Sequence, residues 1–315
     1  MRRKAIIFGI RGTKLTAEER YLLKTEMPWG IILFSRNIKN LFQLKFLIND
    51  IRKIIKDKNY PILIDQEGGR VSRLNKIIDL NLFSQGYFGK LYKHDKKVFT
   101  HHYKIYIDKV SDILKKVGIN INTVPVMDVR RKNSHNVIGN RSFSTDPTIV
   151  SKIGNLCINL YKKNKIATVI KHIPGHGLAK CDSHYNLPVI KAKKTELINK
   201  DFKPFRSCQS FFAMTAHVIY TIYDPIYTAT HSKIVINDVI RKHIGFKGIL
   251  ISDDISMNAL KYGLKDNAIK AIDAGCNLIL HCNGNIKEVS KLVKIIPTID
   301  KFTQKKTSHF YKFLR

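Results

Sequence analysis

The sequence predicts an α/β fold, a single (β/α)₈ barrel of the TIM type, on three observations. The chain has 315 residues, enough for such a barrel, which typically takes about 250. Short apolar, β-branched runs alternate with amphipathic stretches along its whole length. No low-complexity segment and no linker rich in proline and glycine interrupts this alternation, so we expect one domain over residues 1–315.

Eight segments have the composition of buried strands, and we expect them at residues 5–9, 30–34, 62–64, 119–123, 168–170, 212–215, 249–251 and 278–280. Amphipathic segments, expected to be helices, occupy residues 41–56, 104–116, 147–163, 194–205, 233–244 and 267–274. Strands that alternate with helices pair in parallel, because each crossover returns the chain in the same direction. An open doubly wound sheet is the alternative, but the GxGxxG and P-loop patterns are both missing from the sequence.

Composition favours a folded, soluble protein. Hydrophobic residues make up 44% of the chain and charged residues 25%, whereas a disordered chain has fewer apolar side chains. No apolar run approaches the roughly 20 residues that a membrane span requires. The basic start Met1-Arg2-Arg3-Lys4 precedes an apolar stretch that stops at Arg11, too short for an export signal. We therefore expect a cytoplasmic protein without a membrane span.

The net charge of +32 is unusually high for a chain of this composition. Basic proteins attract nucleic acids, anionic membranes and acidic ligands. Here the basic pairs are spread along the chain, and no run of five or six and no arginine-rich arm is present. The abundance of Lys, Ile and Asn is typical of AT-rich codon usage, so we interpret the charge as compositional. A non-catalytic binder of nucleic acid or another anionic polymer is the alternative from a different class of protein.

Polar residues follow several of the predicted strands directly. Asp65 follows the third strand, Lys171 and His172 the fifth, His217 the sixth, and Asp253 the seventh. In a barrel these strand ends share one face, where the active sites of this fold are built. Residues far apart in the sequence are therefore expected to meet there.

The segment of residues 171–184 is rich in histidine and admits a metal-binding, a structural and a catalytic interpretation. His172 and His176 are four apart, as on a zinc-binding helix, but Pro174 and Gly175 between them break a helix. The five cysteines of the chain show no CxxC spacing either. A histidine near a turn can also simply satisfy backbone carbonyl groups, and His176 suits that role.

Catalysis is the third interpretation, and it rests on Asp182 and His184. One residue separates them, so the carboxylate can hydrogen-bond the imidazole, fix its tautomer and favour its protonated form. An imidazole held in this way can give a proton to a leaving oxygen and later take one from water.

The apolar strand at residues 249–251 runs into Ser252 and then two carboxylates. We expect Asp254 to cap a helix that starts at Ser256. Asp253, at the strand end, is expected to point into the mouth of the barrel, where a carboxylate can attack an anomeric carbon.

The segment of residues 65–73 offers groups that bind hydroxyls. Asp65 accepts hydrogen bonds, and an arginine offers a fork of donors. Glu67 is a rival general acid on chemical grounds, but beside Gly68 we expect it to brace Arg70.

Together these motifs resemble the β-N-acetylhexosaminidase branch of glycoside hydrolase family 3, the type that recycles cell-wall muropeptides in bacterial cytoplasm. The resemblance covers nearly the whole chain and is carried by residues 30–37, 65–73, 138–143, 146–147, 171–184, 214–217, 252–257 and 273–276. It implies a TIM barrel, no metal and no organic cofactor.

The resemblance also implies roles for particular residues. Asp253 aligns with the family nucleophile, and His184 with Asp182 aligns with the unusual histidine acid/base of this branch. The residues that align with the sugar-binding groups are Asp65, Arg73, Arg141, Lys171 and His172. The implied substrate is N-acetylglucosamine β-linked to 1,6-anhydro-N-acetylmuramic acid, often with a stem peptide. A phosphorylase, in which phosphate replaces water, is the nearby alternative. We expect a monomer.

Overall fold

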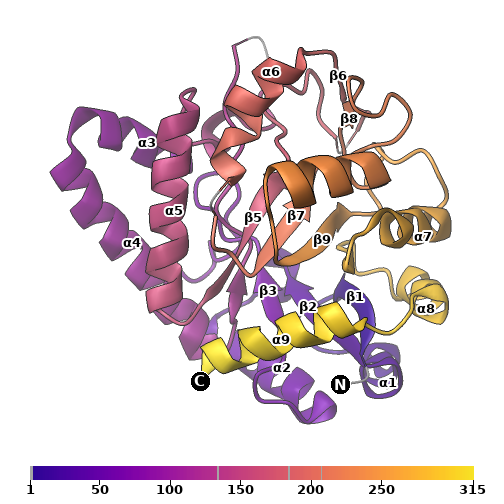
Figure 1. Ribbon diagram of the computed structural model, residues 1–315. Helices are drawn as coiled ribbons and strands as arrows, with labels where there is room; N and C mark the ends of the chain where they lie inside the picture. The colour runs from indigo at the N-terminus through magenta and orange to yellow at the C-terminus, as the bar shows by residue number, and fades with distance from the viewer. Residues whose placement is uncertain (1–2, 133–134, 184, 207) are drawn as a thin grey trace.

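The computed structural model describes residues 3–132, 135–183, 185–206 and 208–315. Parallel strands close into an eight-stranded barrel in the order β1-β10-β9-β7-β5-β4-β3-β2, with helices around it (Figure 1). The strands are β1 (Lys4–Gly9), β2 (Pro28–Leu33), β3 (Ile62–Ile64), β4 (Ile121–Asn122), β5 (Ala167–Ile173), β7 (Phe212–Thr215), β9 (Ile249–Asp254) and β10 (Leu278–His281). Each overlaps a predicted segment, so the (β/α)₈ fold is confirmed.

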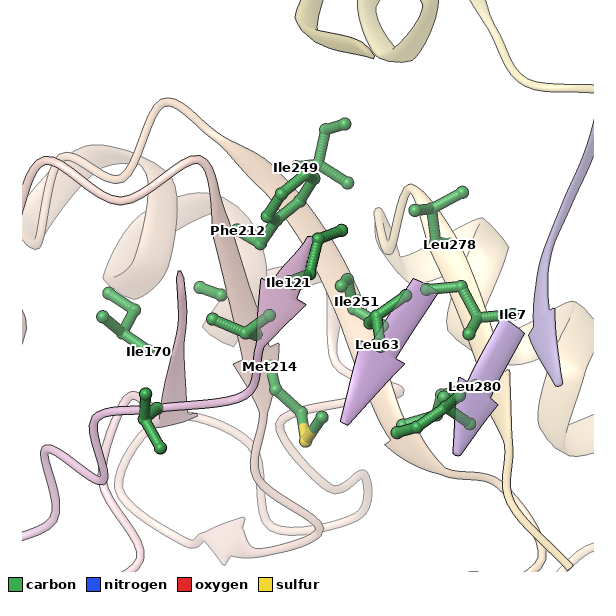
Figure 2. Packing of buried hydrophobic residues seen from close by; sticks show 14 of the residues in the cluster. Ile7, Leu63, Ile121, Ile170, Phe212, Met214, Ile249, Ile251, Leu278 and Leu280 are labelled. Carbon is green, nitrogen blue, oxygen red and sulfur yellow. The ribbon is translucent and has the colours of Figure 1, made fainter. Parts of the chain in front are cut away.

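The barrel core is mainly apolar. Side chains of Leu63, Ile121, Met214 and Ile251 come from different strands and lie close together (Figure 2). All four are at most 3% exposed, and burying a side chain of this size stabilises the fold by about 1.5–3 kcal/mol. The result is a rigid frame whose strand ends hold the polar groups in place.

The helices are α1 (Ala17–Glu26), α2 (Leu41–Ile55), α3 (Gln85–His94), α4 (Lys96–Val117), α5 (Pro147–Lys163), α6 (Lys194–Glu196), α7 (Leu264–Ala274), α8 (Ile286–Ile295) and α9 (Lys301–Leu314). The prediction for α5 is confirmed residue for residue. Asp146 caps this helix by accepting a 2.7 Å hydrogen bond from Thr148 N, and Pro147 occupies its first position.

Two predicted helices differ from the observed structure. The segment 194–205 is not one α-helix: α6 has three residues, followed by a π-helical turn at Leu197–Asp201 and a 3₁₀ turn at Lys203–Phe205. Pro204 lies in the last of these and has no N–H to continue a helical ladder. The segment 233–244 is helical, but its main part, Val235–His243, is a π-helix.

A small two-stranded parallel sheet lies outside the barrel and was not predicted. It pairs β6 (Val189–Ile190) with β8 (Ile219–Tyr220). This pairing ties the long connection between β5 and β7 to the segment that follows β7. Within the described part of the chain, no helix combines the length and the apolarity needed to cross a bilayer.

Candidate active site

A cavity of about 210 Å³ opens at the end of the barrel where the strands have their carboxyl termini. This is smaller than the roughly 300–1,000 Å³ of a drug-sized pocket, so it suits a ligand of about one ring. The predicted nucleophile and all of the predicted sugar-binding residues line it, namely Asp65, Arg73, Arg141, Lys171, His172 and Asp253. Glu67, His176 and Ser183 complete its polar wall.

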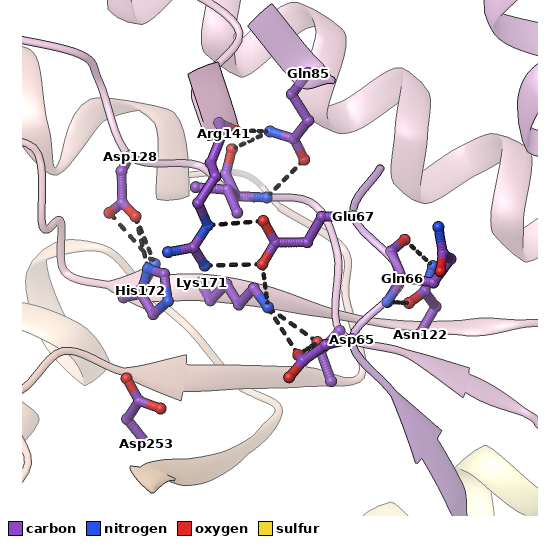
Figure 3. Close-up of polar contacts among 12 residues, drawn as sticks. Asp65, Gln66, Glu67, Gln85, Asn122, Asp128, Arg141, Lys171, His172 and Asp253 are labelled. Carbon is purple, nitrogen blue, oxygen red and sulfur yellow. Dashed lines mark hydrogen bonds and ion pairs between the residues drawn. The ribbon is translucent and has the colours of Figure 1, made fainter. Parts of the chain in front are cut away.

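Lys171, near the end of β5, is the hub of this wall (Figure 3). Its Nζ lies 2.7 Å from Glu67 Oε1, 3.0 Å from Asp65 Oδ1 and 3.0 Å from Thr123 Oγ1. Burial alone would lower the pKa of Lys171, but the Asp65 and Glu67 carboxylates outweigh it and raise that pKa. The side chain therefore stays an ammonium ion.

Asp65 directly follows β3 and is held from two further sides. Thr123 donates its hydroxyl to the carboxylate, and an Arg73 guanidinium nitrogen lies 3.6 Å away. Burial would raise the pKa of Asp65, but the charges of Lys171 and Arg73 overcome that effect and hold the pKa well below its usual range. Asp65 is thus an ionised hydrogen-bond acceptor at neutral pH.

Glu67 pairs with Arg141, and the expectation that it braces Arg70 is wrong. Arg141 Nε and Nη2 each donate a 2.8 Å hydrogen bond to the two Glu67 oxygens. Arg70 instead donates to the backbone carbonyls of Asn136 and Val137. Burial would raise the pKa of Glu67, but Arg141 and Lys171 bring it down to about 2. A group that is ionised at neutral pH cannot give a proton, so Glu67 is no rival general acid.

His172 has a partner that sequence reasoning missed. Its Nδ1 lies 2.7 Å from Oδ2 of Asp128, a residue with no exposed surface. Asp128 follows β4 by a few residues. The rule that polar residues at strand ends gather on one face of the barrel could have found it.

The His176 ring does not make the contact with a backbone carbonyl group that was considered for it, because its Nδ1 has no hydrogen-bond partner among the described residues. The backbone N of His176 donates a 2.6 Å hydrogen bond to Asp128 Oδ1, and its Nε2 lies 3.2 Å from Ser183 Oγ. Burial, and then the nearby His172, lower the pKa of His176 to about 4. A neutral ring in this position holds the loop together.

Asp253 lies near the end of β9, partly exposed in the cavity. One of its oxygens, Oδ1, accepts a 2.8 Å hydrogen bond from Asp254 N. In Figure 3, Asp253 and Asp128 lie on opposite sides of His172. This arrangement leaves Asp253 in reach of a ligand that also contacts His172.

Asp254 has a different task from the one predicted. No helix starts at Ser256, because the next helix, α7, begins only at Leu264. Asp254 Oδ1 instead accepts hydrogen bonds from Ser256 N at 3.1 Å, from Ser256 Oγ at 2.9 Å and from Cys282 N at 3.2 Å. It therefore closes a turn. His217 supports the same region, because its Nε2 lies 2.9 Å from the Asp254 carbonyl oxygen.

Asp182 lies in the loop between β5 and β6. Its carbonyl oxygen accepts hydrogen bonds from Tyr185 N at 3.1 Å and Asn186 N at 2.9 Å, and the next residue, Ser183, lines the cavity. His184 lies outside the described residues. The pairing of Asp182 with His184 therefore stays a prediction.

Among the residues that the structure describes, no group of three or more His, Cys, Asp or Glu side chains is arranged to hold a metal ion. All five cysteines belong to that part of the chain, and all are free.

Comparison with known proteins identifies the family. The model of the glycosyl hydrolase family 3 N-terminal domain matches residues 4–308. A β-hexosaminidase of Psychromonas ingrahamii is 35% identical over 303 residues, which cover 94% of this chain and 88% of that protein.

Two solved structures have the same fold. NagZ from Neisseria gonorrhoeae, in complex with N-trifluoroacetyl-D-glucosamine, superposes with a TM-score of 0.84 at 30% identity, covering 100% of this chain and 91% of that one. A family 3 β-N-acetylglucosaminidase from Paenibacillus sp. gives a TM-score of 0.85 at 26% identity; the match covers 98% of this chain but only 60% of that longer one. The chain therefore belongs to glycoside hydrolase family 3, as an enzyme of the β-hexosaminidase type.

Proposed function

We propose that this protein is a retaining exo-β-N-acetylglucosaminidase that acts in the cytoplasm during peptidoglycan recycling. Its substrate would be N-acetylglucosamine β-linked to 1,6-anhydro-N-acetylmuramic acid, with or without a stem peptide. The observation that carries the proposal is that Asp253 and the sugar-binding candidates Asp65, Lys171 and His172 line one ring-sized cavity. The N. gonorrhoeae protein with N-trifluoroacetyl-D-glucosamine supports an acetamido sugar as the ligand.

In the first step the Asp253 carboxylate attacks the anomeric carbon. The bond from that carbon to the leaving oxygen breaks, and the imidazolium of His184 gives its proton to that oxygen. The products of this step are a glycosyl ester on Asp253 and the free leaving group. Asp182 orients the ring of His184 and favours its charged form.

In the second step water attacks the same carbon from the face that the leaving group vacated. The neutral His184 takes a proton from the water as the bond to Asp253 breaks, which regenerates both groups. Two inversions at one carbon leave the released sugar in the β configuration.

The charged residues of the cavity wall bind the sugar. Asp65 is an ionised acceptor for hydroxyl groups, whereas Arg73, Arg141 and Lys171 are donors. These groups already hold one another through ion pairs, so little rotamer freedom is lost when a sugar binds. We propose that the barrel acts as one catalytic domain.

A chromogenic N-acetyl-β-glucosaminide tests the proposal. Asp253→Ala should lower kcat by about 10³-fold or more, because the nucleophile is lost. Asp238→Ala, which removes an exposed carboxylate paired with Lys242 at 2.8 Å, is the control and should leave kcat unchanged. Near-native turnover by Asp253→Ala would exclude Asp253 as nucleophile.

His184→Ala tests the acid/base assignment separately. A nitrophenolate leaves without protonation, so the first step should survive while the second becomes slow. Azide needs no general base and should restore turnover with formation of the glycosyl azide. Adding phosphate to the wild-type assay separates hydrolysis from phosphorolysis, since a sugar 1-phosphate product would contradict a plain hydrolase.

A further inference from the structure

Asp128 is a fully buried carboxylate beside the sugar cavity, and the proposed reaction assigns it no task. It is 0% exposed and comes from the segment after β4, whereas the cavity-lining His172 comes from β5. An ionised group is costly to bury unless strong hydrogen bonds compensate it. Its partners therefore indicate what it does.

These partners belong to the end of β5, which holds His172, and to the loop that follows it, which holds His176. Asp128 Oδ2 lies 2.7 Å from His172 Nδ1, and both oxygens accept from His172 N at 3.3 Å. Oδ1 accepts a 2.6 Å hydrogen bond from His176 N (Figure 3 shows the His172 contacts). One carboxylate thus holds the ring and backbone of His172 together with the turn that leads toward Asp182.

The contact at His172 Nδ1 determines which ring nitrogen carries a proton. Burial would raise the pKa of Asp128, but its attraction to His172 and its hydrogen bonds keep the pKa below the usual value. An ionised carboxylate can only accept hydrogen bonds, so Nδ1 must carry the hydrogen. In the neutral ring Nε2 is then the acceptor, and His172 lines the cavity that Asp253 also lines.

We propose that Asp128 is a positioning residue for sugar binding: it holds the ring of His172 in the Nδ1–H tautomer, so that Nε2 accepts a hydrogen bond from a ligand hydroxyl group. The inference rests on the proposed sugar-binding function of the cavity. It goes beyond that function because it assigns the orientation of His172 to a buried residue that does not line the cavity. Partners of this kind commonly fix the tautomer and direction of a functional histidine.

A double-mutant cycle with N-acetyl-D-glucosamine as the ligand tests the proposal. Asp128→Asn in the wild type should weaken binding, measured by calorimetry, by about tenfold to a hundredfold, because the ring loses a charge-assisted hydrogen bond. In the His172→Gln background the same substitution should change the affinity by less than about threefold, since the residue through which Asp128 acts is gone. An equal loss in both backgrounds, or none in either, would overturn the proposal.

Asp224→Asn is the matched control. Asp224 is also buried and accepts hydrogen bonds from Ile226 N, Tyr227 N and Ser232 Oγ, away from the cavity lining. This variant should lower the thermal stability yet leave the affinity for N-acetyl-D-glucosamine within about twofold of the wild type. A comparable loss of affinity in Asp224→Asn would mean that Asp128→Asn reports general destabilisation, which would also overturn the proposal.

A spectroscopic measurement on the wild-type protein keeps the proposal testable if Asp128→Asn does not fold. With ¹⁵N-labelled histidine, and the signal of His172 identified by its loss in His172→Gln, the proton should reside on Nδ1. A bare Nδ1 with a proton on Nε2 would overturn the proposal. If His172→Gln alone leaves binding unchanged, the sugar-binding role of His172 fails, whereas the tautomer measurement still judges Asp128 separately.

Discussion

Arg141 and Glu67 meet through two parallel 2.8 Å hydrogen bonds at the wall of the cavity, with side chains 11% and 1% exposed. Glu67 comes from the loop after β3 and Arg141 from the 3₁₀ turn Gly139–Arg141. The pair therefore joins two loops that are separated by 74 positions in the sequence. Lys171 contacts the same carboxylate, so the pair is connected to Asp65 through Lys171.

Glu67→Gln should destabilise the protein by about 3–5 kcal/mol, because it leaves the buried Arg141 without its carboxylate and removes one of the two carboxylates that contact Lys171. It should also raise KM, since Arg141 and Lys171 lose their common support. Urea unfolding and steady-state kinetics check both effects. Asp50→Asn is the control: it breaks an ion pair with the half-exposed Arg20 and should cost no more than about 1 kcal/mol. Equal losses for the two variants would contradict this account.

Gly177→Ala should impair turnover more than stability. A Cβ at this position would lie 1.9 Å from the Val129 carbonyl oxygen, so the loop that leads to Asp182 must shift. A misplacement of about 1 Å near the reacting groups can cost roughly 10²-fold in rate. Gly12→Ala, where a Cβ meets no atom within 4 Å, serves as the comparison in kcat and thermal unfolding. Unchanged kcat in Gly177→Ala would show that the loop position does not matter for the reaction.

Asp201 makes the stability depend on pH. It is 1% exposed, neither carboxylate oxygen has a hydrogen-bond partner among the described residues, and burial raises its pKa to about 7 from the usual 3.8. Between these two pH values the folded protein keeps a proton that the unfolded chain releases. The contribution of Asp201 to stability therefore falls as pH rises from about 4 to about 7, and it levels off above that.

Asp201→Asn checks this dependence, because the amide resembles the protonated carboxyl group. The melting temperature of the variant, relative to the wild type, should rise steadily between pH 4.5 and 7.5. If the melting temperatures of the two proteins differ by the same amount at every pH in this range, Asp201 does not titrate there.

The strands were predictable because each is buried on both sides and reads as an apolar run. Helix α1 was missed although its signal is present: Thr16 and Glu19 form a capping box, with Glu19 N donating to Thr16 Oγ1 at 3.1 Å. The π-helical turns could not be predicted, since their periodicity differs from the α-helical one only slightly over a few residues.

Some residues of the candidate site could also be predicted from the sequence, and others could not. Asp65, Lys171, His172 and Asp253 were accessible to prediction because they sit at strand ends, whose common location follows from the fold alone. The pairing of Glu67 with Arg141 could not be predicted, since it depends on how two loops that are distant in the sequence fold against each other. Asp128 could have been found by applying the strand-end rule to β4.

We propose that Asp253 becomes covalently attached to the sugar during turnover. Mass spectrometry of the enzyme quenched during turnover of an N-acetyl-β-glucosaminide with a fast leaving group tests it most directly, with His184→Ala used to slow the second step. We expect a mass increase of one N-acetylglucosaminyl unit, located on the peptide that contains Asp253. An adduct on another residue, or turnover with inverted anomeric configuration and no adduct, would contradict the account.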